Sequence, residues 1–279
     1  MKTAALVLLL AAAPAAAEMR YATFSSPSLG KDVAYVVQLP ASYATSPARR
    51  YPVLYALHGL FESPGFWERR GLGTFLESLG QRGEVPEMVV VAVDGDNSFF
   101  VDGPAGRWEQ MMARDFVAHV ESTYRVTPGR AGRAALGISM GGYAALRMAL
   151  ARPEMFRAVA THSAMLLEKV PTAEEGAGRW HMAAFHKVFG DPVDAALWAA
   201  NDPLALALKA DPKSAPALYF DCGTEDRYGL FAGNRELHRR LEARGVAHEF
   251  GLYPGDHGYE YVRSVLDKSL RFIGRQFAR

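Results

Sequence analysis

Short apolar runs alternate along the chain with stretches in which apolar residues recur every three or four positions. The short runs are rich in β-branched residues and apolar throughout, which is typical of strands buried on both faces of a sheet. The longer stretches have the spacing of amphipathic helices. This alternation predicts an α/β fold with a mainly parallel central sheet and helices on both faces.

The same pattern sets the boundaries of the predicted elements. Predicted strands are Val33–Leu39, Val53–Leu57, Met88–Val93, Ala134–Ile138, Arg157–Thr161, Ala217–Asp221 and His248–Tyr253. Predicted helices are Gly73–Gln81, Glu109–Tyr124, Met140–Ala151, Asp194–Lys209, Leu230–Arg244 and Tyr259–Phe277. The loops Asp94–Trp108 and Ser163–Asp194 are long for such a fold. Long loops often form lids or binding rims, so we expect both near a functional site.

Residues 1–17 differ from the rest of the chain. Lys2 precedes an apolar run from Ala4 to Ala13, and the small residues Ala15–Ala17 follow. These are the features of a cleaved secretory signal peptide, and the run is shorter than the roughly 20 residues that span a bilayer. We expect residues 18–279 to form one domain, exported as a periplasmic or secreted bacterial protein without stable membrane insertion.

Charge and cysteine content exclude several kinds of partner and site. The 31 basic and 30 acidic residues give a formal net charge of +1, so no net-basic face for nucleic acid is expected. A single cysteine, Cys222, permits neither an intramolecular disulfide nor a cysteine-based zinc site. The segment from Asp94 has Phe99 where a calcium loop needs glycine, and His181 and His186 lack the spacing of a zinc-binding helix. We predict neither metal nor cofactor; the oligomeric state stays open.

One motif carries chemistry: Gly137-Ile138-Ser139-Met140-Gly141-Gly142. It stands between a predicted strand and a predicted helix, which is the setting of the G-x-S-x-G nucleophile elbow. The glycines permit a sharp turn, and the helix N-terminus favours an oxyanion beside the serine. We predict that Ser139 is a nucleophile rather than part of an ordinary Gly/Ser turn.

A serine hydroxyl needs a base to accept its proton, and that base needs an acid to hold its tautomer. In hydrolases with this elbow both follow the serine along the chain. His162 and His257 each follow a predicted strand, where catalytic groups collect in open α/β sheets. His162 precedes every candidate acid, so His257 is the predicted base.

Asp226 is the predicted acid, because it lies in a loop that follows a predicted strand. One helix and one strand fit between Asp226 and His257. Glu225 is the next candidate. Asp221 lies at the strand's end, and Asp256 is too close in sequence to His257 to reach around its imidazole.

An oxyanion hole requires two backbone N–H donors. The hydrolase template takes one from the residue after the nucleophile, here Met140, and one from the loop after an earlier strand. That loop reads His58-Gly59-Leu60-Phe61, and Gly59 lets its backbone turn close to the serine. We predict Leu60 as the second donor, with Phe61 as the alternative.

The motifs H-G-L, D-G-D-N-S, G-I-S-M-G-G, C-G-T-E-D and Y-P-G-D-H follow one another in this order. As a set they resemble the putative-esterase family of α/β-hydrolases, over nearly the whole chain beyond the predicted signal peptide. That family includes S-formylglutathione hydrolases, feruloyl, acetylxylan and tributyrin-type esterases, and mycolyltransferases. The resemblance implies an α/β-hydrolase fold, a triad of Ser139, His257 and Asp226, and oxyanion donors at Leu60 and Met140.

Within the family, the predicted signal peptide disfavours the intracellular S-formylglutathione hydrolases. Mycolyltransferases have an Asp-Gly-Leu-Arg pattern where this chain has His58 to Phe61, which puts sugar-acceptor binding of that kind in doubt. We therefore predict an exported serine carboxylesterase for short-acyl, acetyl or feruloyl esters of small molecules or glycans. Acyl transfer to a sugar or other alcohol by the same triad is the alternative. A binding protein on a hydrolase scaffold is disfavoured, because every triad position is filled.

Aromatic side chains in the predicted rim loops suit an apolar or aromatic acyl group, although ordinary loop packing is the alternative. The predicted substrate-binding residues are His58, Gly59, Phe61, Trp108 and Trp180.

Overall fold

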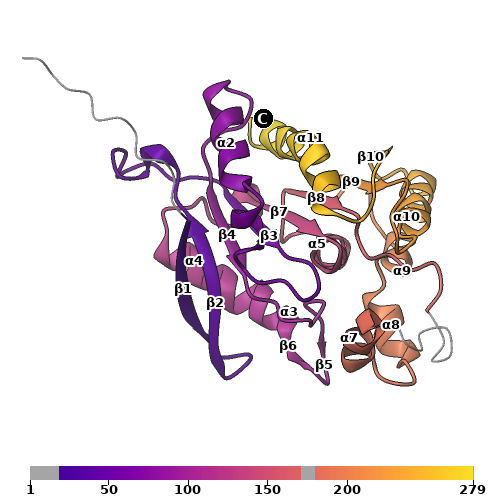
Figure 1. The fold of residues 1–279 in the computed structure, drawn as a ribbon. Coiled ribbons are helices and arrows are strands. Elements are labelled where there is room, and N and C mark those ends of the chain that lie inside the picture. Colours follow the sequence, from indigo (N-terminus) through magenta and orange to yellow (C-terminus); the bar gives the residue numbers. More distant parts are fainter. Residues whose placement is uncertain (1–18, 171–179, 279) are drawn as a thin grey trace, which may run out of the picture.

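The computed structural model describes residues 19–170 and 180–278. A central β-sheet forms the middle of the fold (Figure 1). Its strands are β1 (Met19–Ser26), β2 (Lys31–Gln38), β3 (Val53–Leu57), β4 (Val89–Val93), β7 (Arg133–Ile138), β8 (Ala158–His162), β9 (Ala217–Gly223) and β10 (His248–Tyr253). The eight strands lie in the order β1-β2-β4-β3-β7-β8-β9-β10. β2 pairs antiparallel with β1 and β4, and the remaining pairs are parallel. The predicted mainly parallel sheet is confirmed.

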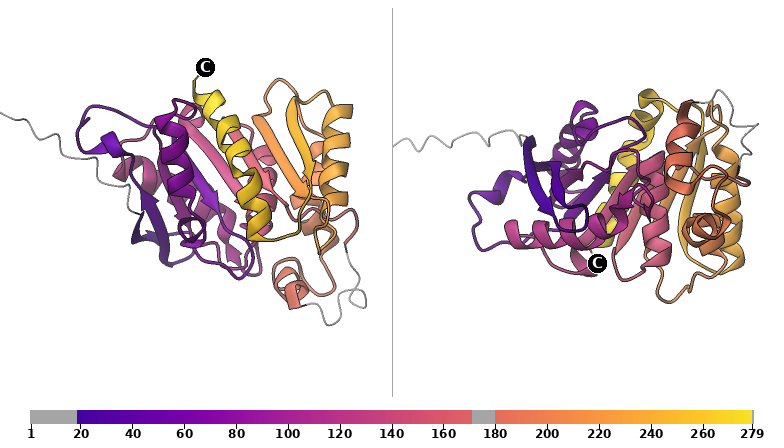
Figure 2. Two further views of the ribbon diagram at one scale, coloured as in Figure 1. Left: turned by 45° about the horizontal axis from the view of Figure 1, so that its top comes forward. Right: turned by 90° about the horizontal axis from the view of Figure 1, so that it is seen from below.

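Helices cover both faces of the sheet, as Figure 2 shows. They are α1 (Phe66–Arg69), α2 (Leu72–Gln81), α3 (Trp108–Gln110), α4 (Val117–Thr123), α5 (Met140–Ala151), α7 (Trp180–Phe189), α8 (Ala195–Asn201), α9 (Pro203–Ala207), α10 (Phe231–Ala243) and α11 (Tyr259–Phe277). Short 3₁₀ turns occupy 41–43 and 130–132, and a π-helical segment, Met111–Phe116, joins α3 to α4.

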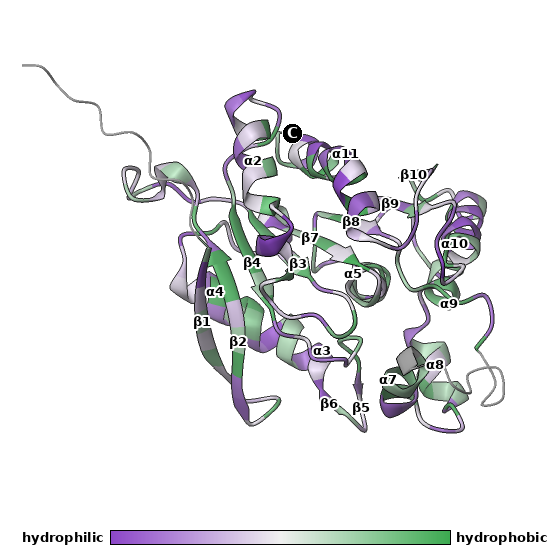
Figure 3. Ribbon diagram, viewed as in Figure 1, coloured by the Kyte–Doolittle hydropathy of each residue, from purple (hydrophilic) through white to green (hydrophobic). Residues whose placement is uncertain are grey.

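Side chains of the inner strands alternate between two hydrophobic clusters. Leu54 and Ala56 of β3 pack with α2 and α11, whereas Tyr55 and Leu57 pack on the other face with α4, α5 and α10. Both faces are therefore buried, which is why β3 and β4 are continuous apolar runs, largely green in Figure 3. Within the described residues, no helix combines the length and apolarity needed to cross a membrane.

Two of the differences from the sequence-based prediction are a divided helix and an added strand. The predicted helix Asp194–Lys209 is divided into α8 and α9, because Pro203 cannot donate a backbone hydrogen bond and instead starts a new helix. The Asp202 side chain caps that helix by accepting from the N–H groups of Leu204 and Ala205. β1 was not predicted, because this edge strand is largely exposed and its sequence lacks regular alternation.

The two long loops contain further structure. Loop 94–108 includes a small hairpin, β5 (Asp102–Gly103) and β6 (Gly106–Arg107). Loop 163–194 includes α7, and residues 171–179 lie outside the described part of the chain. The predicted signal peptide also lies outside it, so cleavage stays a prediction.

Candidate active site

Ser139 lies at a sharp turn between β7 and α5. Its backbone has φ 54° and ψ −115°, a conformation that side-chain-bearing residues rarely adopt. A Cβ at Gly137 would lie 2.2 Å from the Gly141 carbonyl oxygen, and one at Gly141 would lie 2.4 Å from the Leu57 carbonyl oxygen. Because only glycine fits at these positions, the G-x-S-x-G pattern builds the strained elbow that the sequence predicts.

Asp226 and His257 are joined by a short hydrogen bond. His257 Nδ1 lies 2.7 Å from Asp226 Oδ2, and a carboxylate can only accept, so Nδ1 donates. The Asp226 side chain is fully buried, whereas the His257 side chain remains 11% exposed. Burial raises the pKa of Asp226, but the His257 hydrogen bond and charge, with the N–H groups of Tyr228 and Leu230, hold it below its usual value.

The two loops that carry this pair follow neighbouring parallel strands, β9 and β10. Thr224 N–H donates to the Tyr253 carbonyl at 2.9 Å, and Glu225 N–H donates to the Gly255 carbonyl at 3.0 Å. A Cβ at Gly223 would lie 2.2 Å from that same Gly255 oxygen, so glycine is required for the loops to approach. Backbone bonds thus bring the acid and base loops together.

The rival acids and base occupy other environments. His162 and Asp221 are fully buried and bonded to each other at 3.0 Å, and neither lines the cavity described below. Glu225 is exposed. Asp256 accepts from the backbone N–H groups of Arg227 and His257 rather than from the imidazole.

Backbone amides lie where an oxyanion hole would form. Met140 is the first residue of α5, so its N–H has no partner within the helix. A Cβ at Gly59 would lie 3.6 Å from Ser139 Cβ, which brings this loop against the serine. Phe61 N–H donates to Asn97 Oδ1 at 2.6 Å. Of the two predicted alternatives, the geometry therefore favours Leu60.

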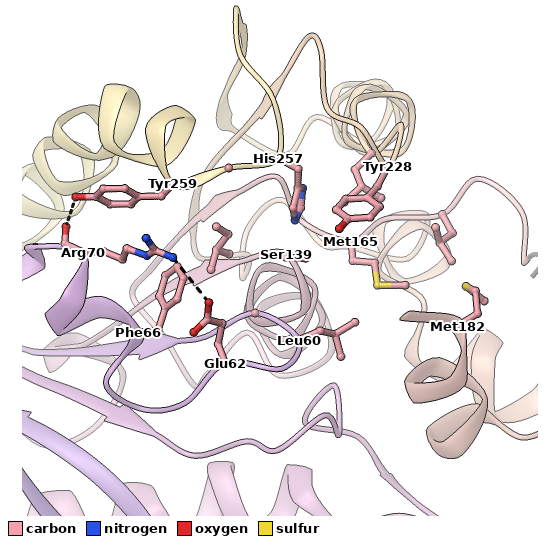
Figure 4. A pocket seen from close by; sticks show the side chains of 15 residues that line it. Leu60, Glu62, Phe66, Arg70, Ser139, Met165, Met182, Tyr228, His257 and Tyr259 are labelled. Atoms are coloured by element: carbon pink, nitrogen blue, oxygen red, sulfur yellow. Dashed lines mark hydrogen bonds and ion pairs between the residues drawn. The ribbon is translucent and has the colours of Figure 1, made fainter. Parts of the chain in front are cut away.

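Ser139 and His257 open onto one cavity of about 300 Å³ (Figure 4). One side of it is apolar, and the other carries charged and aromatic groups. The lining residues are Gly59, Leu60, Glu62, Phe66, Arg70, Ile138, Ser139, Met165, Leu167, Met182, Tyr228, Leu230, His257, Gly258 and Tyr259.

Only some of the predicted substrate-binding residues line the cavity. Gly59 lines the cavity, but His58, Phe61 and Trp108 do not. His58 is fully buried and accepts the Gly95 N–H through Nε2, and Trp108 is buried in the core with its indole N–H donating to Ala105. Phe61 is 52% exposed on the surface. The cavity therefore gives no support to the predicted substrate contacts of these three residues.

Trp180 begins α7, and its side chain lies outside the described part of the structure. Of the two long loops, 163–194 contributes Met165, Leu167 and Met182 to the cavity, whereas 94–108 contributes none of its residues. Loop 94–108 instead contacts the segment His58–Phe61 beside Ser139, through Asn97 and Gly95, so both loops lie near the site but only 163–194 lines the cavity.

Several cavity residues were missed by sequence reasoning. Arg70 and Tyr259 come from distant segments, and no local pattern links them. Tyr228 could have been predicted as a site residue, because it follows Asp226 by two residues in the same loop. Its ring packs edge-on against the His257 imidazole, with the ring centres 4.8 Å apart.

Cys222 lies behind Asp226 and is fully buried, with Sγ 3.6 Å from Asp226 Oδ2. Burial and then the charge of Asp226 raise the pKa of the thiol. We expect iodoacetamide at pH 8 to alkylate Cys222 at least about 100-fold more slowly in the native protein than in urea. Intact-mass time courses measure both rates, and equal rates would contradict the buried placement.

Comparisons with known proteins identify the family of the chain. The family model described as Putative esterase matches residues 26–273. The chain is 27% identical over 263 residues to an esterase of Mycobacterium tuberculosis, Rv1288, covering 85% of this chain and 55% of that protein. It therefore spans about half the length of that relative.

A diacylglycerol acyltransferase/mycolyltransferase, Ag85A of Mycobacterium leprae, is 33% identical over 180 residues, covering 58% of this chain and 50% of that protein. A solved ferulic acid esterase superposes with a TM-score of 0.79 at 28% identity, covering 94% of this chain and 99% of the other. The family resemblance and the fold predicted from sequence are thereby confirmed. The chain belongs to the Putative esterase family, and its fold is that of the α/β-hydrolases.

Proposed function

We propose that the protein is a serine hydrolase of carboxylic esters, with Ser139 as nucleophile, His257 as base and Asp226 as acid. One observation carries the proposal: the Asp226–His257 hydrogen bond of 2.7 Å ends at a cavity onto which a strained elbow serine also opens. Membership of the esterase family supports it.

In the proposed reaction, His257 Nε2 accepts the Ser139 hydroxyl proton while Oγ attacks the ester carbonyl carbon. The N–H groups of Leu60 and Met140 stabilise the resulting oxyanion. The imidazolium then gives its proton to the departing alkoxide, which leaves an acyl-enzyme. Water attacks this ester with the same base, and the carboxylic acid is released. Asp226 keeps the Nδ1 proton of His257 in place throughout.

The two sides of the cavity suit the two parts of an ester (Figure 4). Met165, Leu167 and Met182 offer flexible apolar surface to an acyl chain. On the opposite side Arg70 Nη2 lies 3.9 Å from Glu62, and its guanidinium stacks 4.5 Å from the Tyr259 ring centre. Charged donors and acceptors beside aromatic rings suit the hydroxyls of an alcohol such as a glycan.

Arg70 provides a direct test of the alcohol side. Among the described residues its buried Nε has no hydrogen-bond partner. For an acylated sugar, Arg70→Ala is expected to raise KM about tenfold, since a hydrogen bond from a charged donor contributes about 1.5 kcal/mol or more. Arg69→Ala is the matched control, because Arg69 binds Glu62 but does not line the cavity. Equal KM values for the two variants would contradict the assignment.

A panel of p-nitrophenyl esters from acetyl to feruloyl tests the reaction class. Purified protein should hydrolyse at least one of them with saturation, and the best acyl group identifies the substrate class. Activity no higher than that of Ser139→Ala across the whole panel would reject the proposal.

Acyl transfer is the second candidate, and the similarity to a mycolyltransferase favours considering it. Both reactions share the acyl-enzyme and differ in the attacking oxygen. Added sugar alcohols would divert the acyl group from water in a transferase, and ester products would then appear by mass spectrometry.

We also propose that the protein is exported. The charged start, short apolar run and Ala-x-Ala site support cleavage after residue 17. N-terminal sequencing of protein recovered from a Gram-negative host should begin at Glu18; recovery starting at Met1 would contradict the proposal.

A further inference from the structure

A buried polar network lies behind the proposed acid and base, between β8, β9 and α11. The Asp221 carboxylate accepts hydrogen bonds of 2.7 Å from the hydroxyls of Tyr219 and Tyr261. Both of its oxygens lie 3.0 Å from His162 Nδ1, and His162 Nε2 lies 3.0 Å from Ser269 Oγ. A buried carboxylate is costly unless it is fully paired, so each of these contacts is required.

The network has the residue types of a catalytic triad but no access to substrate. Ser269, His162 and Asp221 are each 0% exposed, and none of them lines the cavity. The proposed reaction uses none of these groups. Their common property is instead that they join α11 to two strands of the sheet.

Tyr261 is the member of the network nearest to the proposed base along the chain. It lies in the first turn of α11, four residues after His257, and only 4% of it is exposed. Its hydroxyl reaches Asp221 on β9, the strand whose loop carries Asp226. Its ring packs against the His257 loop, since a Cβ at Gly255 would lie 2.8 Å from Tyr261 Cδ2.

The His257 loop is therefore held from both ends. Before His257, Glu225 N–H bonds to the Gly255 carbonyl. After His257, the side chain of Tyr261 fixes the start of α11 on β9. The Tyr259 hydroxyl also holds the helix start by donating to the Arg70 carbonyl at 3.0 Å, but that bond does not reach β9. Without the Tyr261 tie, we expect the helix start and the imidazole attached to it to shift relative to Asp226.

We propose that Tyr261, through its hydrogen bond to Asp221, is a positioning residue that sets the separation of His257 from Asp226. This inference rests on the proposed function, because its kinetic consequence is measured as ester hydrolysis. Small misplacements of a catalytic group lower kcat strongly, even when substrate contacts are unchanged.

Tyr219 supplies a matched control. Tyr261→Phe and Tyr219→Phe each remove one hydroxyl, from equally buried rings, that donates to the same carboxylate at the same 2.7 Å. Tyr219 lies on β9 itself, two residues from Asp221, so its bond to Asp221 ties no other element to the strand. Its hydroxyl also interacts with that of Tyr253 at the end of β10, so Tyr219→Phe removes at least as many contacts as Tyr261→Phe. Losses that reflect only a weakened network should be equal in the two variants.

For Tyr261→Phe we expect kcat to fall by about tenfold or more with KM near the wild-type value. For Tyr219→Phe we expect kcat within about twofold of wild type. Equal kcat values for the two variants, at comparable Tm, would overturn the proposal.

A proton NMR measurement tests the geometry without using activity. The His257 Nδ1 proton donated to Asp226 should give a downfield signal in wild type and Tyr219→Phe that is weakened or lost in Tyr261→Phe. An unchanged signal in Tyr261→Phe would overturn the positioning role. If the wild type hydrolyses no ester, the proposed function fails, and this spectrum still decides whether Tyr261 positions His257.

Should Tyr261→Phe fail to fold, Gly255→Ala probes the same contact from the loop side. The added methyl group would lie 2.8 Å from Tyr261 Cδ2, and alanine is also strained at the Gly255 φ of 138°, so the His257 loop must shift relative to the Tyr261 ring. We expect the same selective loss of kcat and of the downfield signal. Wild-type values for both would overturn the proposal.

Discussion

Replacing Ser139 with alanine is expected to lower kcat for ester hydrolysis by at least about 10⁴-fold, because no other nucleophile replaces the serine hydroxyl. The residual rate would come from the oxyanion donors and from binding. The fold should be retained, since alanine meets the same backbone strain at φ 54° as serine does. Circular dichroism and Tm verify folding, and stopped assays with p-nitrophenyl esters give kcat.

Ser163→Ala is the matched control for this variant. Ser163 is also a serine of positive φ, 42°, directly after a parallel strand, but it is buried and does not line the cavity. We expect its kcat to stay within about threefold of wild type. Similar losses in the two variants would mean that the damage comes from the fold rather than from the nucleophile.

Asp226→Asn is expected to lower kcat by about 10⁴-fold at neutral pH while leaving the shape of the site intact. An amide at this position can donate as well as accept, so it no longer forces the proton onto His257 Nδ1. Burial raises the pKa of the Asp226 carboxyl, but the His257 hydrogen bond and charge hold it below its usual value, so the site favours the charged form.

Glu225→Gln is the control that separates the two candidate acids. Glu225 is the adjacent residue in the same loop and carries the same functional group, but its side chain is exposed. Its kcat should remain within about twofold of wild type. A larger loss in Glu225→Gln than in Asp226→Asn would transfer the acid role to Glu225.

Inner parts of the fold were predictable because their patterns have a single physical cause. β3, α5 and α11 match their predicted bounds to the residue. β3 is buried on both faces, and the Gly137 and Gly141 contacts leave the elbow no room for other residues. β1 escaped prediction, since an exposed edge strand needs no apolar pattern, and Pro203 divided a helix whose periodicity continues across it.

The residues of the candidate site also include some that the sequence pattern predicts and others that it does not. The order of residues along the chain and their positions at strand ends predicted Asp226 and His257 as a pair. The structure joins the two side chains by a hydrogen bond, while their catalytic roles stay predictions. The cavity wall was harder to predict, because Arg70 and Tyr259 lie 189 residues apart in the chain and are brought together only by the tertiary fold. Trp108 had an aromatic side chain in a long loop, but its indole turns into the core, and no local pattern separates that outcome from a binding role.

Labelling with a fluorophosphonate tests the central claim most directly, because the probe reacts only with an activated serine. Wild-type protein should gain the mass of one probe, and peptide mapping should place it on Ser139. Asp226→Asn should react far more slowly, and Ser163→Ala at the wild-type rate. A folded wild-type protein that stays unlabelled at Ser139, or is labelled at another serine, would contradict the account.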